Sequence, residues 1–487
     1  MRWNVAQVAE SVGVSAPTGL GGGVELVAVS IDSRTVRHGE LFFAIRGPRH
    51  DGHDHVAGAL AAGAGAAVVE RGRLASYPEG VRAKLFAVDD TLAALQRLAS
   101  AACAIWRAAK PGRRIAGVAG SVGKTTTKEI LAALLCARFG VLKTQGNLNN
   151  EYGLPLTLLG LSDEHDAAVV ELGMSHRGEL AQLTRIAHPE VGVITRVAVE
   201  HLEFFSSIEE IALAERELIE NLPWPGATAV LNADDERVAR FADVARGPVI
   251  RYGAAATADF RVEALEERGM EGAAFDFVWP GGRARLESPL IGRHNVMNAL
   301  AALAAASVWG IGAEDAKRVF PELKPADKRG EVVRYEEEFA VINDTYNSSP
   351  TALGEVIALL AKTPGYRRKI LAVGEMRELG DSSAELHRES GRAAFAAGRI
   401  DWIFGVTGNA KEFVQGAIAA GYPGERTRFF ENSQEAGDFV QSVVTKGDLL
   451  LLKGSRGVKM EKILEAIDTK HARKTGEGSP GPAGQSH

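Results

Sequence analysis

The sequence is poor in cysteine and lacks an excess of positive charge. Only two cysteines, Cys103 and Cys136, occur among 487 residues, which excludes a disulfide scaffold and argues against a cysteine-based zinc site. Both lie in Ala/Leu-rich stretches, so we expect buried, inert thiols. Acidic residues number 62 against 56 Lys and Arg, a net charge of −6. A nucleic-acid-binding protein would normally carry a basic excess, so we expect no nucleic-acid partner.

Long apolar runs are missing too. No stretch approaches the roughly 18 consecutive apolar residues of a membrane-spanning helix. The first residues, MRWNVAQVAESVG, lack the cationic and apolar regions of a signal peptide. We therefore expect a cytoplasmic protein without membrane insertion. Apolar residues at 46% and charged residues at 24% are ordinary globular proportions, and the length suggests about three domains.

Strand-like and helix-like segments alternate along most of the chain. Apolar strands such as RIAGVAG and TAVLNADD, each followed by a helical stretch, indicate a parallel, doubly wound sheet. The segments ADFRVEALEERG and AAFDFVW suggest antiparallel strands that depart from this parallel pattern. We predict an α/β protein of three domains. They are a small mixed α/β N-terminal domain (1–110), a central P-loop-type doubly wound domain (111–323) and a C-terminal Rossmann-like α/β domain (324–469), before a disordered tail (470–487).

The strongest local motif is GVAGSVGKTTTKE at 117–129. A strand ends there and Lys124 begins a helix, so that backbone N–H groups face an anion. The lysine can reach the β- and γ-phosphates of a nucleotide, and a threonine hydroxyl can hold Mg²⁺. Val118 stands where a standard phosphate loop has its first Gly, so this is a shorter variant, and the loop alone names no reaction. The predicted phosphate-loop residues are Gly120, Ser121, Gly123, Lys124, Thr125 and Thr126.

Two polar residues follow the ends of predicted strands. Glu171 ends the strand AAVVELGM, and His201 in VAVEHLEFF follows another, so both should reach the edge of the sheet that holds the phosphate loop. A carboxylate among Val and Leu is costly unless it binds a cation, and we predict that the pair holds a second Mg²⁺. The alternatives are a solvated strand end and a surface histidine. The cluster RHDGHDH at 49–55 is better explained by a polar turn than by a metal site.

Nine motifs in order resemble the Mur ligase family of peptidoglycan synthesis, over about residues 25–465. They are DSRTVRHGELFFAIRG with DGHDH, GSVGKTTTKE, TQGNLNNEYGLPLTLL, ELGMSHRGEL, EHLEFFSS, GRHNVMNALAA, NDTYNSSP, GEMRELG and LLKGSRGVKME. The DTYNSSP segment is most similar to family members that add D-alanyl-D-alanine to UDP-N-acetylmuramoyl-tripeptide. This resemblance implies a monomeric enzyme of cell-wall synthesis that uses ATP and Mg²⁺. It would make an acyl phosphate that the incoming amine attacks.

The resemblance also implies roles for individual residues. Asn295 and Asn298 share one helix face and would bind adenine, with helix capping as the alternative. Arg329 and Asp344 would contact the nucleotide when the domains close. The remaining residues implied to touch substrate are Ser33 and Arg34 for the uridine nucleotide, Asn147, Asn149, Asn150 and Glu151 for the muramoyl-peptide, and Tyr346, Asn347 and Ser348 for the dipeptide.

One position departs from the family. Ser207 and Glu210 are spaced as a capping box, and Glu215 falls on the apolar stripe of the helix that follows, so it should face inward. Most family members have a lysine here, carbamylated by CO₂, that serves the second Mg²⁺. We predict that the Glu215 carboxylate takes this place, through a water or a neighbouring side chain. The alternatives are another amide ligase of the superfamily and a catalytically impaired nucleotide-binding homologue.

Overall fold

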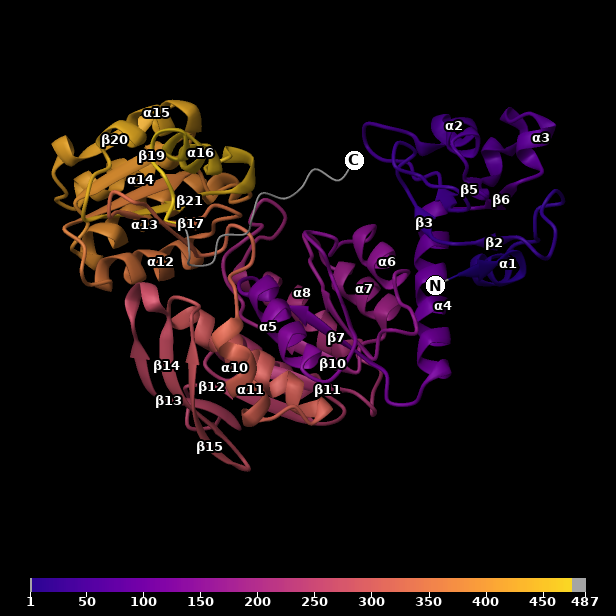
Figure 1. The fold of residues 1–487 in the computed structure, drawn as a ribbon, viewed down its shortest axis with the longest axis horizontal. Helices are drawn as coiled ribbons and strands as arrows, with labels where there is room; N and C mark the ends of the chain where they lie inside the picture. Colours follow the sequence, from indigo (N-terminus) through magenta and orange to yellow (C-terminus); the bar gives the residue numbers. More distant parts are fainter. Residues whose placement is uncertain (1, 475–487) are drawn as a thin grey trace.

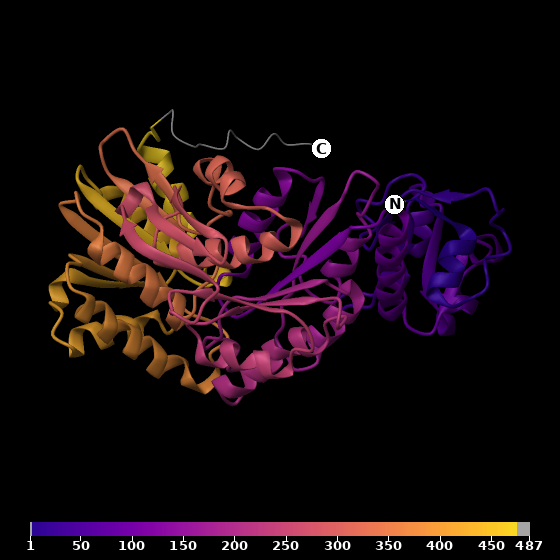
Figure 2. The same ribbon diagram turned by 90° about the horizontal axis from the view of Figure 1, so that it is seen from below.

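The structure, a computed structural model, describes residues 2–474. Three domains follow one another along the long axis (Figure 1), and the N-terminal and C-terminal domains occupy opposite ends of the molecule (Figure 2). Each is built on its own sheet, with helices between most of the strands. The predicted α/β class with three domains is therefore confirmed. Within residues 2–474, no helix combines the length and apolar character needed to cross a membrane.

The N-terminal domain is a four-stranded parallel sheet in the order β3-β4-β5-β6, beside the antiparallel pair β1-β2. Its strands are short and its apolar side chains point into two cores. Its elements are β1 (Trp3–Asn4), α1 (Val5–Val12), β2 (Glu25–Leu26), β3 (Val29–Ser30), β4 (Leu41–Phe43), α2 (Val56–Ala61), β5 (Ala66–Glu70), α3 (Glu79–Arg82), β6 (Leu85–Val88) and α4 (Thr91–Ala109).

Helix α4 joins the N-terminal and central domains. Its apolar face packs on α1 and β5 on one side and on α6 (Gly153–Leu158) and α7 (Glu179–Ala187) on the other. Trp106, at the far end of α4, donates from its indole Nε1 to the His165 carbonyl at 3.0 Å. Arg107 pairs with Glu190 at 2.6 Å. One continuous apolar core therefore runs from the N-terminal domain into the central one.

The central domain has a nine-stranded sheet in the order β15-β14-β13-β12-β11-β10-β7-β9-β8. Strands β7 to β13 are parallel, and β14 and β15 extend the sheet in antiparallel fashion, as predicted. The elements not yet given are β7 (Arg114–Ala119), α5 (Lys124–Cys136), β8 (Val141–Lys143), β9 (Ala167–Glu171), β10 (Val191–Ile194), α8 (Ile208–Glu220), β11 (Thr228–Asn232), α9 (Glu236–Ala239), β12 (Val249–Gly253), β13 (Phe260–Glu267), β14 (Ala273–Trp279), β15 (Gly282–Ser288), α10 (Arg293–Ala306) and α11 (Ala313–Val319).

The C-terminal domain has a six-stranded sheet in the order β16-β17-β21-β18-β19-β20, parallel except for β16. Helices α13 and α14 pack so closely that a Cβ on Gly391 would lie 2.0 Å from the Phe413 carbonyl oxygen. The elements are β16 (Glu331–Arg334), β17 (Ala340–Asp344), α12 (Pro350–Lys362), β18 (Arg368–Gly374), α13 (Ser383–Ala397), β19 (Trp402–Val406), α14 (Ala410–Ala419), β20 (Thr427–Phe430), α15 (Ser433–Val443), β21 (Asp448–Lys453) and α16 (Glu461–Lys470).

Two expectations need correction. Cys103 is buried, and burial raises the pKa of its thiol to about 12, but Cys136 is exposed. Leu134 and Leu135 take the buried face of α5, so the next residue turns toward solvent. The chain is also ordered beyond the predicted tail boundary at 470, because Lys474 N–H donates to the Arg334 carbonyl at 2.9 Å. Residues 475–487 of the expected tail lie outside the described residues.

Candidate active site

The phosphate loop lies between β7 and α5, as predicted, and its glycines are required by its geometry. Gly120 has φ of 114° and Gly123 has φ of 96°, both in the region that favours glycine. A Cβ on Gly120 would lie 2.2 Å from the Thr195 hydroxyl, and one on Gly123 would lie 2.3 Å from the Asn298 amide oxygen. The loop therefore turns where no larger residue fits.

Lys124 is the cation of this loop. Its Nζ donates to the carbonyl oxygens of Gly120 at 2.5 Å and Ser121 at 3.1 Å, and it lies 4.0 Å from Glu200 Oε1. Burial opposes the charged form of Lys124, but the carboxylates of Glu200, Glu215 and Glu171 outweigh burial and raise its pKa. The Lys124 ammonium is therefore charged at neutral pH, as phosphate binding requires.

Glu171 lies directly beside the start of α5. The Thr125 hydroxyl donates to Glu171 Oε2 at 2.8 Å, and the Asn149 amide donates to Oε1 at 2.9 Å. The Glu171 backbone N–H donates to the Thr144 hydroxyl oxygen at 3.0 Å, a contact that sequence reasoning missed. The half-buried Thr125 hydroxyl beside the buried Glu171 carboxylate offers the oxygen ligands that Mg²⁺ prefers. The residues present therefore fit a magnesium ion.

The protein groups alone do not enclose a metal. Across residues 2–474, no three or more His, Cys, Asp or Glu side chains are arranged to hold a metal ion. This arrangement suits Mg²⁺, which commonly takes one or two carboxylates from the protein and the rest of its ligands from phosphates and water. In the N-terminal HDGHDH segment, His53 is instead buried, and its Nε2 accepts from the Glu70 N–H at 2.9 Å. His53 therefore serves the local fold.

His201 lies in the loop after β10 and faces the C-terminal domain. Its Nδ1 lies 2.6 Å from Glu378 Oε2, and its Nε2 lies 3.8 Å from Glu200 Oε2. Burial lowers the pKa of His201, but the ion pair with Glu378 and the charge of Glu200 outweigh burial, so that the pKa is raised. Among the described residues, neither a hydrogen bond nor an ion pair joins His201 to Glu171.

Glu215 faces inward, as its helical phase predicted. The residue is 1% exposed, and its Oε2 accepts a hydrogen bond of 2.7 Å from the Gly120 N–H. Burial raises the pKa of Glu215 to about 7, although the nearby Lys124 favours the ionised form. The hydrogen bond that the structure shows therefore reaches the phosphate-loop backbone rather than a neighbouring side chain.

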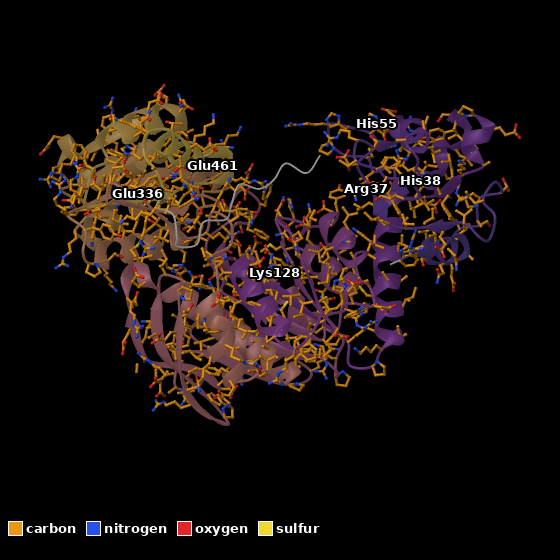
Figure 3. All side chains as sticks on the ribbon, viewed as in Figure 1. Arg37, His38, His55, Lys128, Glu336 and Glu461 are labelled. Carbon is orange, nitrogen blue, oxygen red and sulfur yellow. The ribbon has the colours of Figure 1, made fainter. Side chains whose placement is uncertain are left out.

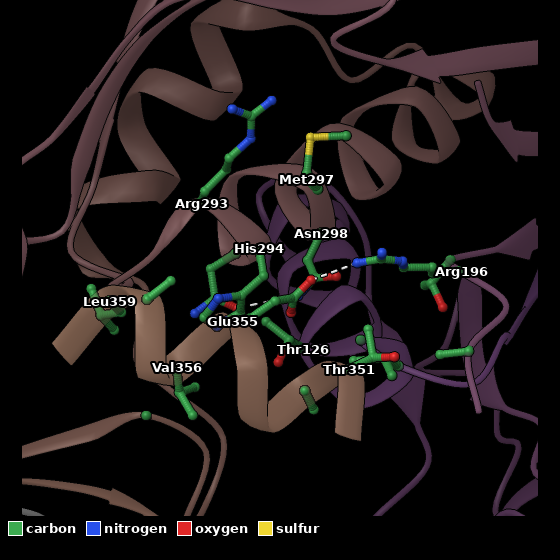
Figure 4. Close-up of a pocket in the computed structure, with 18 of the residues that line it drawn as sticks. Thr126, Arg196, Arg293, His294, Met297, Asn298, Thr351, Glu355, Val356 and Leu359 are labelled. Carbon is green, nitrogen blue, oxygen red and sulfur yellow. Dashed lines mark hydrogen bonds and ion pairs between the residues drawn. The ribbon is translucent and has the colours of Figure 1, made fainter. Parts of the chain in front are cut away.

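A cavity of about 670 Å³ lies between the central and C-terminal domains, next to the phosphate loop. Figure 4 shows Thr126 and Asn298 from the central domain facing Glu355 and Leu359 of α12 across it. Arg196 spans the two sides through an ion pair with Glu355 at 2.7 Å. The cavity is therefore shaped jointly by two domains.

The two asparagines of α10 form part of the cavity wall. The Asn295 amide donates to the Ile291 carbonyl at 2.8 Å, and Asn298 donates to Asn295 Oδ1 at 3.2 Å. Both are buried and line the cavity. The N-cap of α10 is Gly292, so the alternative that these asparagines cap the helix is wrong.

The C-terminal domain contributes charged residues to the same cavity. Arg329 and Asp344 line it, as expected, together with Lys453. Lys453 is 3% exposed and donates to Asp344 Oδ2 at 2.7 Å and to the Asn347 carbonyl at 3.0 Å. The Arg329 guanidinium lies 4.2 Å from the Tyr346 ring centre. Sequence reasoning missed Lys453, although a lysine ending the apolar strand DLLLLK is a detectable signal.

The other predicted substrate residues are spread more widely. Ser33 and Arg34 lie in the N-terminal domain, where Arg34 pairs with Asp32 at 2.6 Å and is exposed. Asn147 and Asn150 are exposed in the loop that brings Asn149 to Glu171, and Glu151 is half-buried there. Near Tyr346, Asn347 is exposed and Ser348 is buried, and the Ser348 hydroxyl has no hydrogen-bond partner among the described residues.

Comparison with known proteins agrees with this geometry. Three family models match: Mur ligase family, catalytic domain, at 25–102; Mur ligase middle domain at 118–306; and Mur ligase, glutamate ligase domain, at 328–456. The UDP-N-acetylmuramoyl-tripeptide--D-alanyl-D-alanine ligase of Bacillus subtilis is 36% identical, over 90% of this chain and 92% of the relative. The Escherichia coli protein of the same name is 35% identical, over 92% and 95%.

Solved structures give the same result. A crystal structure of MurF from Acinetobacter baumannii matches with a TM-score of 0.85 and 28% identity, over 96% of this chain and 99% of that one. MurF ligase from Thermotoga maritima in complex with ADP matches with a TM-score of 0.78 and 29% identity, over 91% and 97%. These relatives are ligases by name, and the phosphate loop with adjacent carboxylates, beside a second α/β domain, fits the ATP-dependent ligase class that they represent. The chain belongs to the Mur ligase family.

Proposed function

We propose that the protein joins D-alanyl-D-alanine to UDP-N-acetylmuramoyl-tripeptide in peptidoglycan precursor synthesis, with ATP converted to ADP and phosphate. The names of the Bacillus subtilis and Escherichia coli relatives give these two substrates and call the proteins ligases. The observation that carries the proposal is the meeting of Lys124, Thr125 and Glu171 beside a cavity shared by two domains. Such a site can hold a triphosphate while two other substrates approach from either side.

The first step transfers a phosphoryl group. An oxygen of the tripeptide's terminal carboxylate attacks the γ-phosphorus of ATP, ADP leaves, and an acyl phosphate forms. Lys124 and the backbone N–H groups at the start of α5 would face the phosphates, where negative charge develops. We propose that Thr125, Glu171 and His201 hold Mg²⁺, which would neutralise charge on the transferring phosphoryl group.

The second step forms the amide bond. The amine of D-alanyl-D-alanine attacks the carbonyl carbon of the acyl phosphate, a tetrahedral intermediate forms, and its collapse releases phosphate while the nitrogen loses a proton. The enzyme contributes mainly positioning and charge stabilisation. We assign the dipeptide side to Tyr346, Asn347 and Ser348, because they follow β17 beside Arg329 and Lys453. The unsatisfied Ser348 hydroxyl is available to a ligand.

The remaining site residues keep the roles given by the family. We propose that Asn295, Asn298, Arg329 and Asp344, which line the cavity, bind the nucleotide. Ser33 and Arg34 would hold the uridine nucleotide in the N-terminal domain. The loop of Asn147, Asn149, Asn150 and Glu151 would face the muramoyl-peptide.

Glu215 contacts the phosphate loop from α8. Its hydrogen bond to the Gly120 N–H places a carboxylate beside the turn that must receive phosphate. We propose that Glu215 takes the place of the family's carbamylated lysine, which also presents an anionic pair of oxygens, and that the enzyme needs no bicarbonate. We further propose that the protein works as a monomer in the cytoplasm, with domain boundaries near residues 110 and 323.

The deciding experiment measures phosphate release from purified protein, with ATP and Mg²⁺ present throughout. We expect release only when UDP-N-acetylmuramoyl-tripeptide and D-alanyl-D-alanine are both added, with the ligated product visible by mass spectrometry. Release with another amino substrate would favour a different amide ligase of the superfamily. ATP binding without release under any combination would show a catalytically impaired nucleotide-binding protein.

A further inference from the structure

Two loops from different domains meet next to the phosphate loop. One follows β10 and carries His201, and the other follows β18 and carries Glu378. Both residues have left-handed backbones, with φ of 53° and 64°, a conformation that residues other than glycine adopt rarely. Non-glycine residues keep such a conformation only where the surroundings hold it, often at functional contacts. The loops are tied by the Glu203 N–H, which donates to the Glu378 carbonyl at 3.2 Å.

The contact fixes which way the His201 ring faces. Nδ1 lies 2.6 Å from Glu378 Oε2, so the opposite nitrogen, Nε2, is turned away from the C-terminal domain. Nε2 faces Glu200, whose other carboxylate oxygen lies 4.0 Å from the Lys124 ammonium. A carboxylate this close to one imidazole nitrogen favours the tautomer with the proton on that nitrogen, which leaves the lone pair of the other nitrogen free in a defined direction. Here that direction is toward the phosphate loop.

We propose that Glu378 is a positioning residue, supplied by the C-terminal domain, that orients His201 so that Nε2 can bind Mg²⁺. The inference rests on the proposed metal role of His201. Because the carboxylate and the histidine belong to different domains, the oriented metal site exists only while the C-terminal domain is docked. Metal binding and docking are therefore coupled, and each favours the other.

Another interdomain ion pair provides a matched control. Arg334 of β16 pairs with Glu271, in the turn before β14, at 2.6 Å. Glu271 is exposed, belongs to the antiparallel part of the central sheet and does not line the nucleotide cavity. Removing its carboxylate deletes one exposed ion pair between the domains, which contributes little to docking, and does not touch His201. The loss of an interdomain ion pair as such can thus be separated from loss of the Glu378–His201 contact.

The test measures Mn²⁺ binding by electron paramagnetic resonance, without turnover. The full chain is saturated with a non-hydrolysable ATP analogue and UDP-N-acetylmuramoyl-tripeptide, and D-alanyl-D-alanine is left out. We expect Glu378→Ala to weaken the weaker of two Mn²⁺ sites by about 10- to 100-fold, the usual effect of losing a carboxylate behind a metal-bound histidine. Glu378→Gln should recover part of the affinity, because its amide oxygen can still lie against Nδ1. Glu271→Ala should bind as the wild type does.

Parallel measurement of His201→Ala separates the inference from the proposed function. If His201→Ala weakens Mn²⁺ binding and Glu378→Ala does not, Glu378 does not position the ligand. If His201→Ala itself binds Mn²⁺ normally, His201 is not a metal ligand, and both its proposed role and this inference are wrong. Equal losses in Glu271→Ala and Glu378→Ala would also overturn the inference, since domain contact alone would explain them. Should Glu378→Ala unfold, the folded Glu378→Gln variant decides. Weaker Mn²⁺ binding than in the wild type would support the inference, and identical binding would contradict it.

Discussion

Glu215 Oε2 and the backbone N–H of Gly120 are joined by a hydrogen bond of 2.7 Å, although 95 residues separate them in the sequence. The bond links the buried face of α8 to the first glycine of the phosphate loop. The Glu215 carboxyl has little contact with water, and its pKa of about 7 reflects that burial. The loop therefore rests on a group whose charge changes near neutral pH.

Stability should respond to that charge. Between pH 4.5 and about 7, Glu215 keeps a proton in the folded protein that it loses in the unfolded chain, so stability falls as pH rises through this window. Glu215→Gln removes the titration, and its melting temperature relative to the wild type should increase from pH 5 to 7 and then level off. Over the whole window, the free energy of unfolding of the wild type should fall by roughly 3 kcal/mol relative to that of Glu215→Gln. Thermal unfolding of both proteins from pH 5 to 8 checks this, and a constant difference would contradict it.

Ligation by the wild type should not depend on bicarbonate, because Glu215 brings its own carboxylate. Glu215→Ala should slow turnover about 10- to 100-fold, as expected for a residue that supports a metal site. Turnover is measured in CO₂-free buffer and again with added bicarbonate. Glu220→Ala, an exposed change on the same helix, should behave as the wild type. An inactive wild type beside an active, bicarbonate-dependent Glu215→Lys would mean that glutamate here disables the enzyme.

Lys124→Ala should abolish measurable ligation, a loss of about 10³-fold or more, because the lysine supplies charge where charge develops in phosphoryl transfer. The fold should persist, since within residues 2–474 the hydrogen bonds of Lys124 Nζ go to carbonyls of its own loop and its contact with Glu200, at 4.0 Å, is long. Circular dichroism and turnover are compared with those of Lys317→Ala, which changes a lysine on the surface of α11. Near-normal turnover with unchanged dichroism would rule out the phosphate-loop assignment.

The C-terminal domain should move about the linker at 324–330. Within it, Lys328 has φ of 56° and its ammonium pairs with Glu461 of α16 at 3.0 Å; Glu461 is labelled on the C-terminal domain in Figure 3. Substrates must enter a cavity whose walls belong to two domains, so the domains must separate and close. Small-angle scattering should show a smaller radius of gyration with nucleotide and UDP-substrate than without. The same radius in both conditions would count against closure.

Much of the fold could be predicted because its signals are local. Apolar runs such as DLLLLK mark buried strands, and the Gly-Lys-Thr spacing marks the phosphate loop, since both depend on neighbouring residues alone. The inward phase of Glu215 followed from helical periodicity. Cys136 was misplaced because an Ala/Leu-rich composition does not fix which face of the helix a residue takes.

The contacts that complete the site could not be predicted in this way. Glu378 meets His201, and Lys453 meets Asp344, only because separate strands end at neighbouring places in the folded molecule. The pairing of Lys474 with Arg334 uses backbone groups, which leave no signature in side-chain composition. Sequence patterns thus found the main phosphate-binding groups, and the tertiary structure supplied their partners.

The shared core under α4 has a practical consequence. Because Trp106 and Arg107 anchor that helix to the central domain while its other face closes the N-terminal core, these two domains cannot separate without exposing apolar surface. Fluorescent labels placed on either side of α4 should report an unchanging distance when substrates bind. The distance between these two labels would serve as an internal reference, with which the change in distance between labels on either side of the 324–330 linker could be compared.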